Sequence, residues 1–259
     1  MSETEEPPVL FERDGHVAII TFNRPRVHNA INADMADAIE AHVATVESDP
    51  AIRVALIAAR GKSFCAGADL KQVSAGFGQP VKARPGGFAG FVYARREKPW
   101  IAAVHANAYG GGVEIALACD MIIAAEDMAF TLPEVRRGLI PGAGGVIRAA
   151  RFLPRGIALE LVGGAAPLSA RRAYELGMVN HLAPADRVLD EAKALAARIA
   201  ANAPLAVRQA MRLTRAAADV GDAELRALQE EAVEIVRASP DAAEGARAFV
   251  EKREPSWRG

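Results

Sequence analysis

The chain has 259 residues, which is enough for one large domain with a sizeable buried core. Hydrophobic residues make up 51% of it and charged residues 24%, and the formal net charge is −1. This balance is typical of a soluble globular protein and excludes an overall electrostatic attraction to nucleic acid or to an anionic membrane. No run approaches the ~18 apolar residues of a membrane span. We therefore expect neither a nucleic-acid partner nor a membrane partner.

Two features indicate the compartment. The chain has only two cysteines, Cys65 and Cys119, which are too few for a disulfide framework and favour a reducing compartment. The first eight residues are acidic and proline-rich, and they lack the basic start and apolar stretch of a signal peptide. We expect residues 1–8 to form a disordered tail and the protein to be cytoplasmic.

The N-terminal half alternates strand patterns with helical ones. Residues 9–13 and 17–22 flank an Asp-Gly pair, which predicts a β-hairpin. Asn32 is a suitable N-cap for a helix that runs to about Val46. Continuous apolar runs predict buried strands at residues 54–58, 101–104 and 120–124. This order of elements favours repeated ββα or βα units around a parallel sheet.

The C-terminal half has a different pattern, which is helical from about Gly142 to the end. Predicted helices cover residues 155–161, 169–176, 186–201, 204–217, 223–237 and 241–252. Before them, residues 74–90 are rich in glycine and proline and predict a mobile loop that covers a pocket. We place the core at residues 9–200 and a separate C-terminal helical region at residues 201–259.

Two glutamates stand beside glycine-rich turns. Glu114 follows three glycines, residues 110–112, and Glu134 precedes the turn at residues 141–145. Glycine lets backbone N–H groups approach a ligand closely, and a helix N-terminus leaves such groups unpaired. Two carboxyl groups around such a site favour proton transfer on a carbonyl compound beside an oxyanion. Taken singly, Glu114 is also explained by its favourable position at a helix N-terminus, and Glu134 by an ion pair with a neighbouring arginine.

Five segments in this order resemble the crotonase, or enoyl-CoA hydratase, superfamily. They are Asn29–Asn32, Ser63–Leu70, Gly110–Glu114, Leu132–Glu134 and Ile140–Gly145, within a resemblance that extends from Asn23 to Arg253. The resemblance implies an α/β fold of the ClpP/crotonase type, a spiral of ββα units with a C-terminal helical region that mediates trimerisation. It also implies a homotrimer or a dimer of trimers that acts on an acyl-CoA thioester. Coenzyme A then belongs to the substrate, and no separate cofactor is expected.

The resemblance assigns roles to the motifs. The backbone N–H groups of Ala68 and Gly111 correspond to an oxyanion hole for the thioester carbonyl oxygen. Glu114 and Glu134 correspond to two carboxyl groups that flank one water and share the proton transfers. The N–H groups of the turn that begins at Gly142 help to orient the water or a glutamate side chain. The predicted reaction is reversible syn addition of water to a trans-2-enoyl-CoA.

Further positions resemble residues that bind the substrate or coenzyme A. They are Arg26, Ala66, Asp69, Leu70, Tyr109, Gly142, Phe249 and Lys252. Arg26 matches a position near the CoA phosphates, and the Ala66 carbonyl matches one that accepts from the adenine amine. Phe249 and Lys252 match positions that reach over the CoA of a neighbouring subunit. Arg26 is equally well explained as a solvated loop charge, and Phe249 as a core residue of the last helix.

Tyr109 and His105 depart from the pattern common in the family. Tyr109 stands near the position of a leucine and is expected to line the acyl pocket, where its ring limits or polarises the pocket. The five histidines are scattered without the spacing of metal ligands, so no metal site is expected. Gly61-Lys62-Ser63 is not a P-loop, because position 56 is leucine. Cys65 is interpreted as a small turn residue rather than a nucleophile.

Three other functions remain open. Enoyl-CoA isomerisation needs only one of the two carboxyl groups, so the presence of both favours a hydratase. Dehydration of a specialised hydroxyacyl-CoA uses the same residues in the reverse direction. A non-catalytic acyl-CoA-binding protein on this fold requires neither Glu114 nor Glu134, and the retention of both glutamates disfavours it.

Overall fold

The computed structural model describes residues 6–69 and 84–259, and within these ranges the main sheet has six strands. Their order is β1-β2-β3-β4-β6-β9. The strands are β1 (Val9–Asp14), β2 (Val17–Phe22), β3 (Val54–Ala59), β4 (Trp100–Val104), β6 (Met121–Ala125) and β9 (His181–Ala183). β1 pairs antiparallel with β2, as the hairpin prediction requires, and the other neighbours pair in parallel. The continuous apolar runs are buried, as expected for a parallel sheet covered on both faces.

A second, smaller sheet positions the site. Within the described part of the chain it has three short strands, β5 (Ala108–Tyr109), β7 (Ala129–Thr131) and β8 (Leu168–Ser169), in the order β5-β7-β8. β4 and β6 are each followed by one of these strands and then by a helical segment. Each of these two ββα units therefore contributes one strand to each sheet, in agreement with the predicted crotonase-like spiral.

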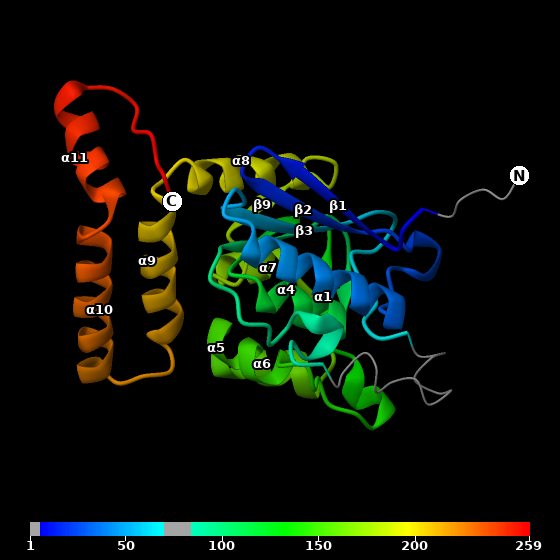
Figure 1. Ribbon diagram of the computed structural model, residues 1–259. Helices are drawn as coiled ribbons and strands as arrows, with labels where there is room; N and C mark the ends of the chain where they lie inside the picture. The colour runs from blue at the N-terminus through cyan, green and yellow to red at the C-terminus, as the bar shows by residue number, and fades with distance from the viewer. Residues whose placement is uncertain (1–5, 70–83) are drawn as a thin grey trace, which may run out of the picture.

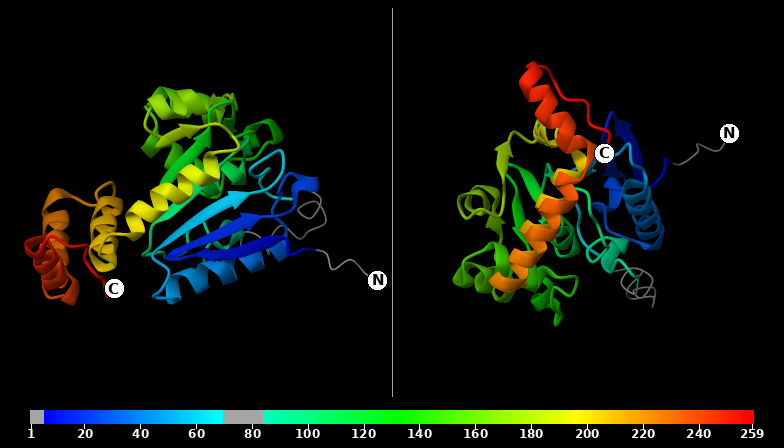
Figure 2. Two further views of the ribbon diagram at one scale, coloured as in Figure 1. Left: turned by 90° about the horizontal axis from the view of Figure 1, so that it is seen from above. Right: turned by 60° about the vertical axis from the view of Figure 1, so that its left-hand side comes forward.

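Helices cover both faces of the main sheet. α1 (Ala33–Ser48) lies along one face and α8 (Val188–Ala200) crosses the other (Figures 1 and 2). The Asn32 side chain accepts from Met35 N at 3.0 Å, which confirms the predicted N-cap of α1. Among the residues that the structure describes, the other α-helices of the body are α4 (Gly111–Ala118), α5 (Gly145–Phe152), α6 (Arg155–Gly163) and α7 (Ala170–Glu175).

The last three helices form a separate group at one end of the molecule (Figures 1 and 2). They are α9 (Pro204–Ala216), α10 (Asp222–Arg237) and α11 (Pro240–Glu251). Arg215 fixes α9 to the body by donating to Asp120 Oδ1 and Oδ2 at 2.7 and 2.8 Å, beside the start of β6. No helix of the described residues is both long and apolar enough to cross a bilayer.

Two strands lie where the sequence predicts only helices. β8 and β9 interrupt the region after Gly142, and β9 extends the main sheet by pairing with β6. Strands of two or three residues are too short to show the alternation by which a strand is recognised. Their pairing with strands far away in the sequence, and not their own pattern, determines their conformation.

Two loop predictions also need correction. Residues 6–8 are not a disordered tail, because the Pro8 carbonyl accepts from Asn23 N at 2.9 Å and Glu6 pairs with Arg60 at 3.0 Å. In the predicted loop at residues 74–90, only residues 84–90 are described, and the 3₁₀ helix η3 (Phe88–Gly90) within them is buried. The glycines there permit close packing against α1, where Gly90 lies on the Glu40 side chain.

Candidate active site

The backbone of Gly67 touches the start of α4. An added Cβ on Gly67 would lie 2.9 Å from the Gly111 nitrogen and 3.2 Å from the Tyr109 oxygen. Gly67 also has a φ of 86°, which side chains rarely adopt. At Gly112 a Cβ would overlap the Cys65 carbonyl oxygen. These glycines therefore allow two main-chain segments to meet at van der Waals distance.

The two predicted oxyanion N–H groups lie at this contact. Ile31 N donates to Gly67 O at 2.8 Å, and Asp69 N donates to Ile31 O at 2.9 Å. In such a parallel bridge, the intervening residue Ala68 directs its own N–H to the opposite side. Gly111 is the first residue of α4, and a helix supplies no acceptor for its first N–H groups. The geometry is consistent with the prediction that both groups bind an oxyanion.

Glu114 is held in a buried position by the second glycine-rich turn. Its Oε1 accepts from Ala143 N at 2.7 Å and from Gly145 N at 2.8 Å, and the residue is only 4% exposed. Burial raises the pKa of the Glu114 carboxyl above its ordinary value, and the two N–H donors oppose that rise. The carboxyl group is thus fixed in one orientation and is less acidic than a solvated glutamate.

Glu134 lies next to Glu114 in space. It begins the 3₁₀ helix η4 (Glu134–Arg137) and is half-buried, and its Oε1 lies 2.9 Å from the position that a Cβ on Gly110 would take. Its charge is one of the causes that raise the pKa of Glu114. Arg136, one of the two neighbouring arginines (Arg136 and Arg137) of the alternative explanation, donates to the Ala165 carbonyl at 3.0 Å. The two carboxyl groups therefore share one electrostatic environment beside Gly111.

Phe88 and Arg148 also belong to this region, although sequence reasoning missed both. A Cβ on Gly111 would lie 2.5 Å from Phe88 Cε1, so the phenyl ring packs directly over the predicted oxyanion residue. Arg148 Nη1 donates to the Ala143 carbonyl at 3.1 Å, behind the turn that holds Glu114. Arg148 lies one helical turn after the glycine-rich turn, and this spacing could have indicated from the sequence that it belongs to the site. Phe88 gave no signal, because it lies in a glycine-rich segment that predicts a loop.

The predicted adenine and phosphate positions share one surface. Ala66 is exposed, and its N–H donates to the His28 carbonyl at 2.9 Å, which joins it to the loop that carries Arg26. Arg26 is exposed on η1 (Pro25–Val27). Asp69 forms an ion pair with Arg24 at 3.4 Å, which fixes the same two loops together. Leu70 lies outside the described residues.

The structure places the predicted glycine turn and Tyr109 as follows. Two N–H groups of the turn, those of Ala143 and Gly145, bind Glu114, while Gly142 is exposed and its contact with substrate stays a prediction. The Tyr109 hydroxyl lies 3.3 Å from Asn107 Nδ2, and Asn107 Oδ1 in turn accepts from the first residue of β7. Asn107 thus tethers the Tyr109 ring, while the Tyr109 carbonyl lies at the contact with Gly67. That the ring lines the acyl pocket stays a prediction.

Phe249 and Lys252 do not join the site of their own chain. Both lie at the C-terminal end of α11, which is at the opposite end of the molecule from the loop that follows β2 (Figures 1 and 2). Phe249 is 85% exposed and the adjacent Val250 is 80% exposed. The alternative that Phe249 is a core residue of the last helix is therefore wrong for the single chain.

Cys65 is a structural residue of the oxyanion turn. It is fully buried, its Sγ lies 3.2 Å from the Asn29 carbonyl, and burial raises its thiol pKa to about 12. Such a thiol carries almost no thiolate at neutral pH, which agrees with its interpretation as a turn residue. In the described part of the chain, no three His, Cys, Asp or Glu side chains gather as metal ligands would.

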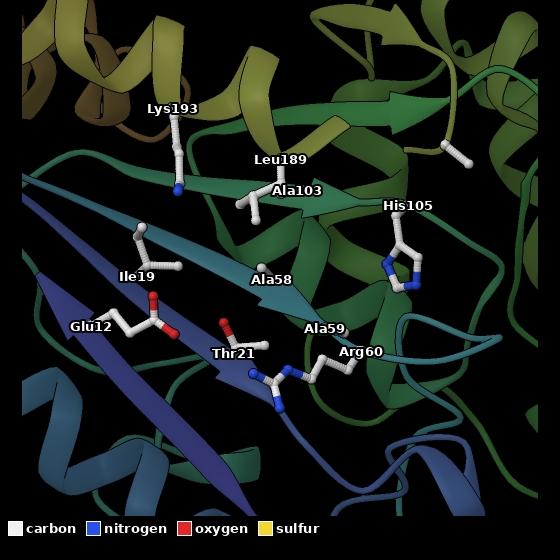
Figure 3. A pocket seen from close by; sticks show the side chains of 11 residues that line it. Glu12, Ile19, Thr21, Ala58, Ala59, Arg60, Ala103, His105, Leu189 and Lys193 are labelled. Atoms are coloured by element: carbon white, nitrogen blue, oxygen red, sulfur yellow. The ribbon is translucent and has the colours of Figure 1, made fainter. Parts of the chain in front are cut away.

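A separate cavity of about 280 Å³ lies on the outer side of the main sheet, under α8 (Figure 3). Glu12 and Lys193 extend over it from opposite sides, above the small side chains of Ala58 and Ala103. His105 also lines it and makes a 2.7 Å hydrogen bond with the Gly61 carbonyl. Neither predicted catalytic glutamate faces this cavity, so it is distinct from the candidate active site.

Comparison with known proteins identifies the family. The family model described as enoyl-CoA hydratase/isomerase matches residues 12–259. The crystal structure of enoyl-CoA hydratase from Mycobacterium tuberculosis H37Rv is similar with a TM-score of 0.93 at 42% identity, covering 98% of this chain and 100% of that chain. Carnitinyl-CoA hydratase from Mycobacterium avium has a TM-score of 0.78 at 43% identity, covering 97% and 98% of the two chains. Carnitinyl-CoA dehydratase of Salmonella paratyphi B is 38% identical over 253 residues, which cover 95% of this chain and 97% of that relative.

These matches extend over nearly the whole chain, and the matched range spans both glycine motifs and both glutamates. The family implies an acyl-CoA substrate. The chain therefore belongs to the enoyl-CoA hydratase/isomerase family, the crotonase family, and is one of its hydro-lyases.

Proposed function

We propose that the protein is an enoyl-CoA hydratase that adds water reversibly and syn across the double bond of a trans-2-enoyl-CoA. One observation carries this proposal. Glu114 and Glu134 are close enough for the charge of one to raise the pKa of the other, and both lie beside the contact between Gly67 and Gly111. Two carboxyl groups and two main-chain donors are the complement that hydration of a thioester requires.

The N–H groups of Ala68 and Gly111 stabilise the intermediate. Attack of water at C3 moves electrons through C2 onto the thioester carbonyl oxygen, which becomes an enolate oxygen. Two fixed donors that are shielded from water lower the energy of that charge without having to reorganise, and one such donor is worth about 3–4 kcal/mol of barrier. The Phe88 ring over Gly111 supplies part of that shielding.

The two glutamates divide the proton transfers. The two amides at Oε1 of Glu114 leave its Oε2 to accept a proton from the attacking water. Glu134 donates a proton to C2 on the same side, so the addition is syn. Burial and the nearby charge of Glu134 both favour the neutral form of Glu114, so the protonation of the two groups is coupled.

Exposed apolar residues near the C-terminus support a proposal for the subunit arrangement. Phe249 and Val250 are almost fully exposed in the single chain, and Val233 and Ile235 on α10 are also exposed. Side chains of this kind are normally covered in a stable protein, and a second copy of the chain offers a cover. We propose a homotrimer or a dimer of trimers in which Phe249 and Lys252 reach the CoA of a neighbouring subunit. The cytoplasmic location stays a prediction, supported by two free cysteines that are both buried.

A second candidate is dehydration of a hydroxyacyl-CoA with a charged acyl group, such as carnitinyl-CoA. Its support is the similarity to proteins named carnitinyl-CoA dehydratase and carnitinyl-CoA hydratase. A quaternary ammonium group is bound by carboxylates or by the faces of aromatic rings. The face of the Tyr93 ring is occupied by the Arg148 guanidinium, whose Cζ lies 5.2 Å from the ring centroid, so this face is not open to a quaternary ammonium group. We therefore rank a neutral acyl group first.

Replacing either glutamate tests the proposed function. Glu114→Gln and Glu134→Gln should each lower kcat for hydration of crotonyl-CoA by about 10²–10⁴-fold, because each loses one proton transfer. The loss of conjugated thioester absorbance measures the rate, and calorimetry with a saturated acyl-CoA should show nearly unchanged binding. Because the pKa of Glu114 is raised and its ionised form is the base, wild-type activity should fall on the acidic side at a higher pH than an ordinary glutamate would give.

Glu230→Gln is the control, because Glu230 is an exposed glutamate on α10 and its replacement should leave kcat unchanged. Full activity of Glu134→Gln would contradict the hydratase mechanism and favour isomerisation. Binding of several acyl-CoA thioesters without any turnover by the wild-type protein would identify a binding protein instead.

The oxyanion contact is tested by adding one methyl group. Gly67→Ala places a Cβ 2.9 Å from the Gly111 nitrogen at a backbone φ of 86°, so the two donors must separate. We expect kcat to fall by about 10²–10³-fold, the loss that removal of one oxyanion donor causes. Gly156→Ala on α6 meets open space and should keep the wild-type kcat. A fully active, folded Gly67→Ala protein would exclude this oxyanion site.

The choice of acyl group is measured with two substrates under the same conditions. Hydration of crotonyl-CoA should have a kcat/KM at least ten-fold above that for dehydration of carnitinyl-CoA, after allowance for the equilibrium constants. The physical reason is that the face of the Tyr93 ring, whose hydroxyl lies beside Gly144 in the turn that holds Glu114, is occupied by the Arg148 guanidinium. The reverse ranking would make the second candidate the function.

The subunit proposal is tested at Phe249. Light scattering should give three or six chain masses for the wild-type protein. Phe249→Asp should raise the KM for crotonyl-CoA or dissociate the assembly, because a buried carboxylate would replace an apolar contact. Phe249→Leu keeps the contact apolar and is the matched control. A monomer that is fully active would overturn the proposal.

A further inference from the structure

Arg148 is a half-buried cation that bonds to two backbone carbonyl oxygens and lies over an aromatic ring. It lies on the second turn of α5. Its Nη1 donates to the Ala143 carbonyl at 3.1 Å, and its Nη2 donates to the Val92 carbonyl. Its Cζ is 5.2 Å from the centroid of the Tyr93 ring. A planar guanidinium with donors on both sides can bridge two backbone segments in this way, whereas a lysine ammonium presents a single point.

The hydrogen bond from Arg148 to the Ala143 carbonyl connects Arg148 with Glu114, the proposed base. Ala143 N–H donates to Glu114 Oε1, and the Ala143 carbonyl accepts from Arg148. The same residue therefore connects the base on one side with the guanidinium on the other. Gly144, between the two amides that hold Glu114, has a φ of 96°, and a Cβ there would overlap Arg148 Nη1. The turn is thus shaped around the guanidinium as well as around the carboxylate.

The hydrogen bond from Arg148 to the Val92 carbonyl connects Arg148 with the segment that covers Gly111, the proposed oxyanion residue. Val92 and Tyr93 lie on the segment that begins with Phe88, and the Phe88 ring packs over Gly111. By donating to the Val92 carbonyl and stacking on Tyr93, Arg148 fixes that segment to the turn that holds Glu114. One side chain therefore connects the two parts of the site, which come from distant parts of the sequence.

The charge of Arg148 acts on the same carboxyl group. Four influences on the pKa of Glu114 accompany its burial, which is the largest: Gly145 and Ala143 lower the pKa, Glu134 raises it, and Arg148 lowers it. The charged or titratable groups that interact electrostatically with Arg148 are Tyr93, Glu114, Arg151, Cys119 and Arg96. Arg148 is therefore the cation that opposes Glu134 in keeping Glu114 ionised.

We propose that Arg148 is a positioning residue for hydration, which holds the Glu114 carboxylate and the Phe88 cover of Gly111 in register with each other. It acts through the Ala143 and Val92 carbonyls. This inference rests on the proposed function, because register between base and oxyanion site matters only for a reaction that uses both. Misplacement of reacting groups by about 1 Å can cost on the order of 10²-fold in rate.

The test compares Arg148→Gln with Arg148→Lys by steady-state kinetics of crotonyl-CoA hydration across pH. Arg148→Gln should lower kcat about ten- to hundred-fold with little change in KM, and it should shift the acidic limb of kcat to higher pH. The shift has this sign because removal of a positive charge raises the pKa of Glu114 further. Arg148→Lys keeps the charge without the two-sided bridge, so it should restore the acidic limb while kcat stays low.

Arg151→Gln is the matched control on the same helix. Arg151 has a half-exposed side chain that pairs with Asp219 at 2.5 Å, and its replacement should leave kcat and the acidic limb at wild-type values. A merely structural role for Arg148 would lower the thermal midpoint of Arg148→Gln without moving the acidic limb, and that result would overturn the proposal. An unchanged kcat in a folded Arg148→Gln protein would overturn it as well.

A second readout separates this proposal from the proposed function. The Glu114 carboxyl carbon can be titrated by NMR in protein labelled at the glutamate δ-carbon, with Glu114→Gln to assign the signal. Arg148→Gln should raise the observed Glu114 pKa and Arg148→Lys should not. If the wild-type protein hydrates no enoyl-CoA, the proposed function fails while this titration still tests the link. If hydration is normal and the titration is the same in all variants, the Arg148 proposal fails alone.

Discussion

The site depends on one buried carboxylate that is held by two backbone amides. Glu114 lies at the start of α4 and its Oε1 accepts from Ala143 and Gly145, so a residue of one ββα unit is fixed by the turn that follows the next unit. Burial of a carboxylate without partners is costly, and the two charge-assisted hydrogen bonds offset that cost. The same burial makes the group a stronger base than a solvated glutamate, so the interaction that allows burial also adapts the group to its proposed chemistry.

Glycine has a different purpose at each part of this site. At Gly67 and Gly112 it removes side chains that would separate two backbone segments, which creates the contact where the N–H groups of Ala68 and Gly111 lie. At Gly144 it supplies a left-handed backbone conformation beside the guanidinium of Arg148. At Gly67 and Gly112 the missing side chain lets two segments approach each other, whereas at Gly144 glycine allows one segment to adopt a positive φ. Together they explain why the site is built from main-chain groups with only a few side chains.

Local patterns were sufficient for much of the fold. The β1–β2 hairpin, the Asn32 cap of α1 and the buried parallel strands were all predicted correctly, because an Asp-Gly turn, a capping side chain and a continuous apolar run act over a few residues. β8 and β9 were missed, and so was the burial of η3, because these elements are too short to carry a pattern and exist through their partners. The exposure of Phe249 was also unpredictable, since an apolar residue on a helix has the same pattern whether it faces a core or another subunit.

The sequence by itself determined the types of chemical group at the site: two glutamates, two sets of glycines and their order along the chain, which are enough to indicate proton transfer beside an oxyanion. Only the tertiary structure decided which groups meet. It showed that two amides of the predicted turn, those of Ala143 and Gly145, bind Glu114, directed Asp69 to Arg24, and brought Arg148 and Phe88 to the site. The reason is that residue types and turn conformations are local properties, whereas a hydrogen bond between residues 29 or 31 positions apart depends on how whole ββα units stack.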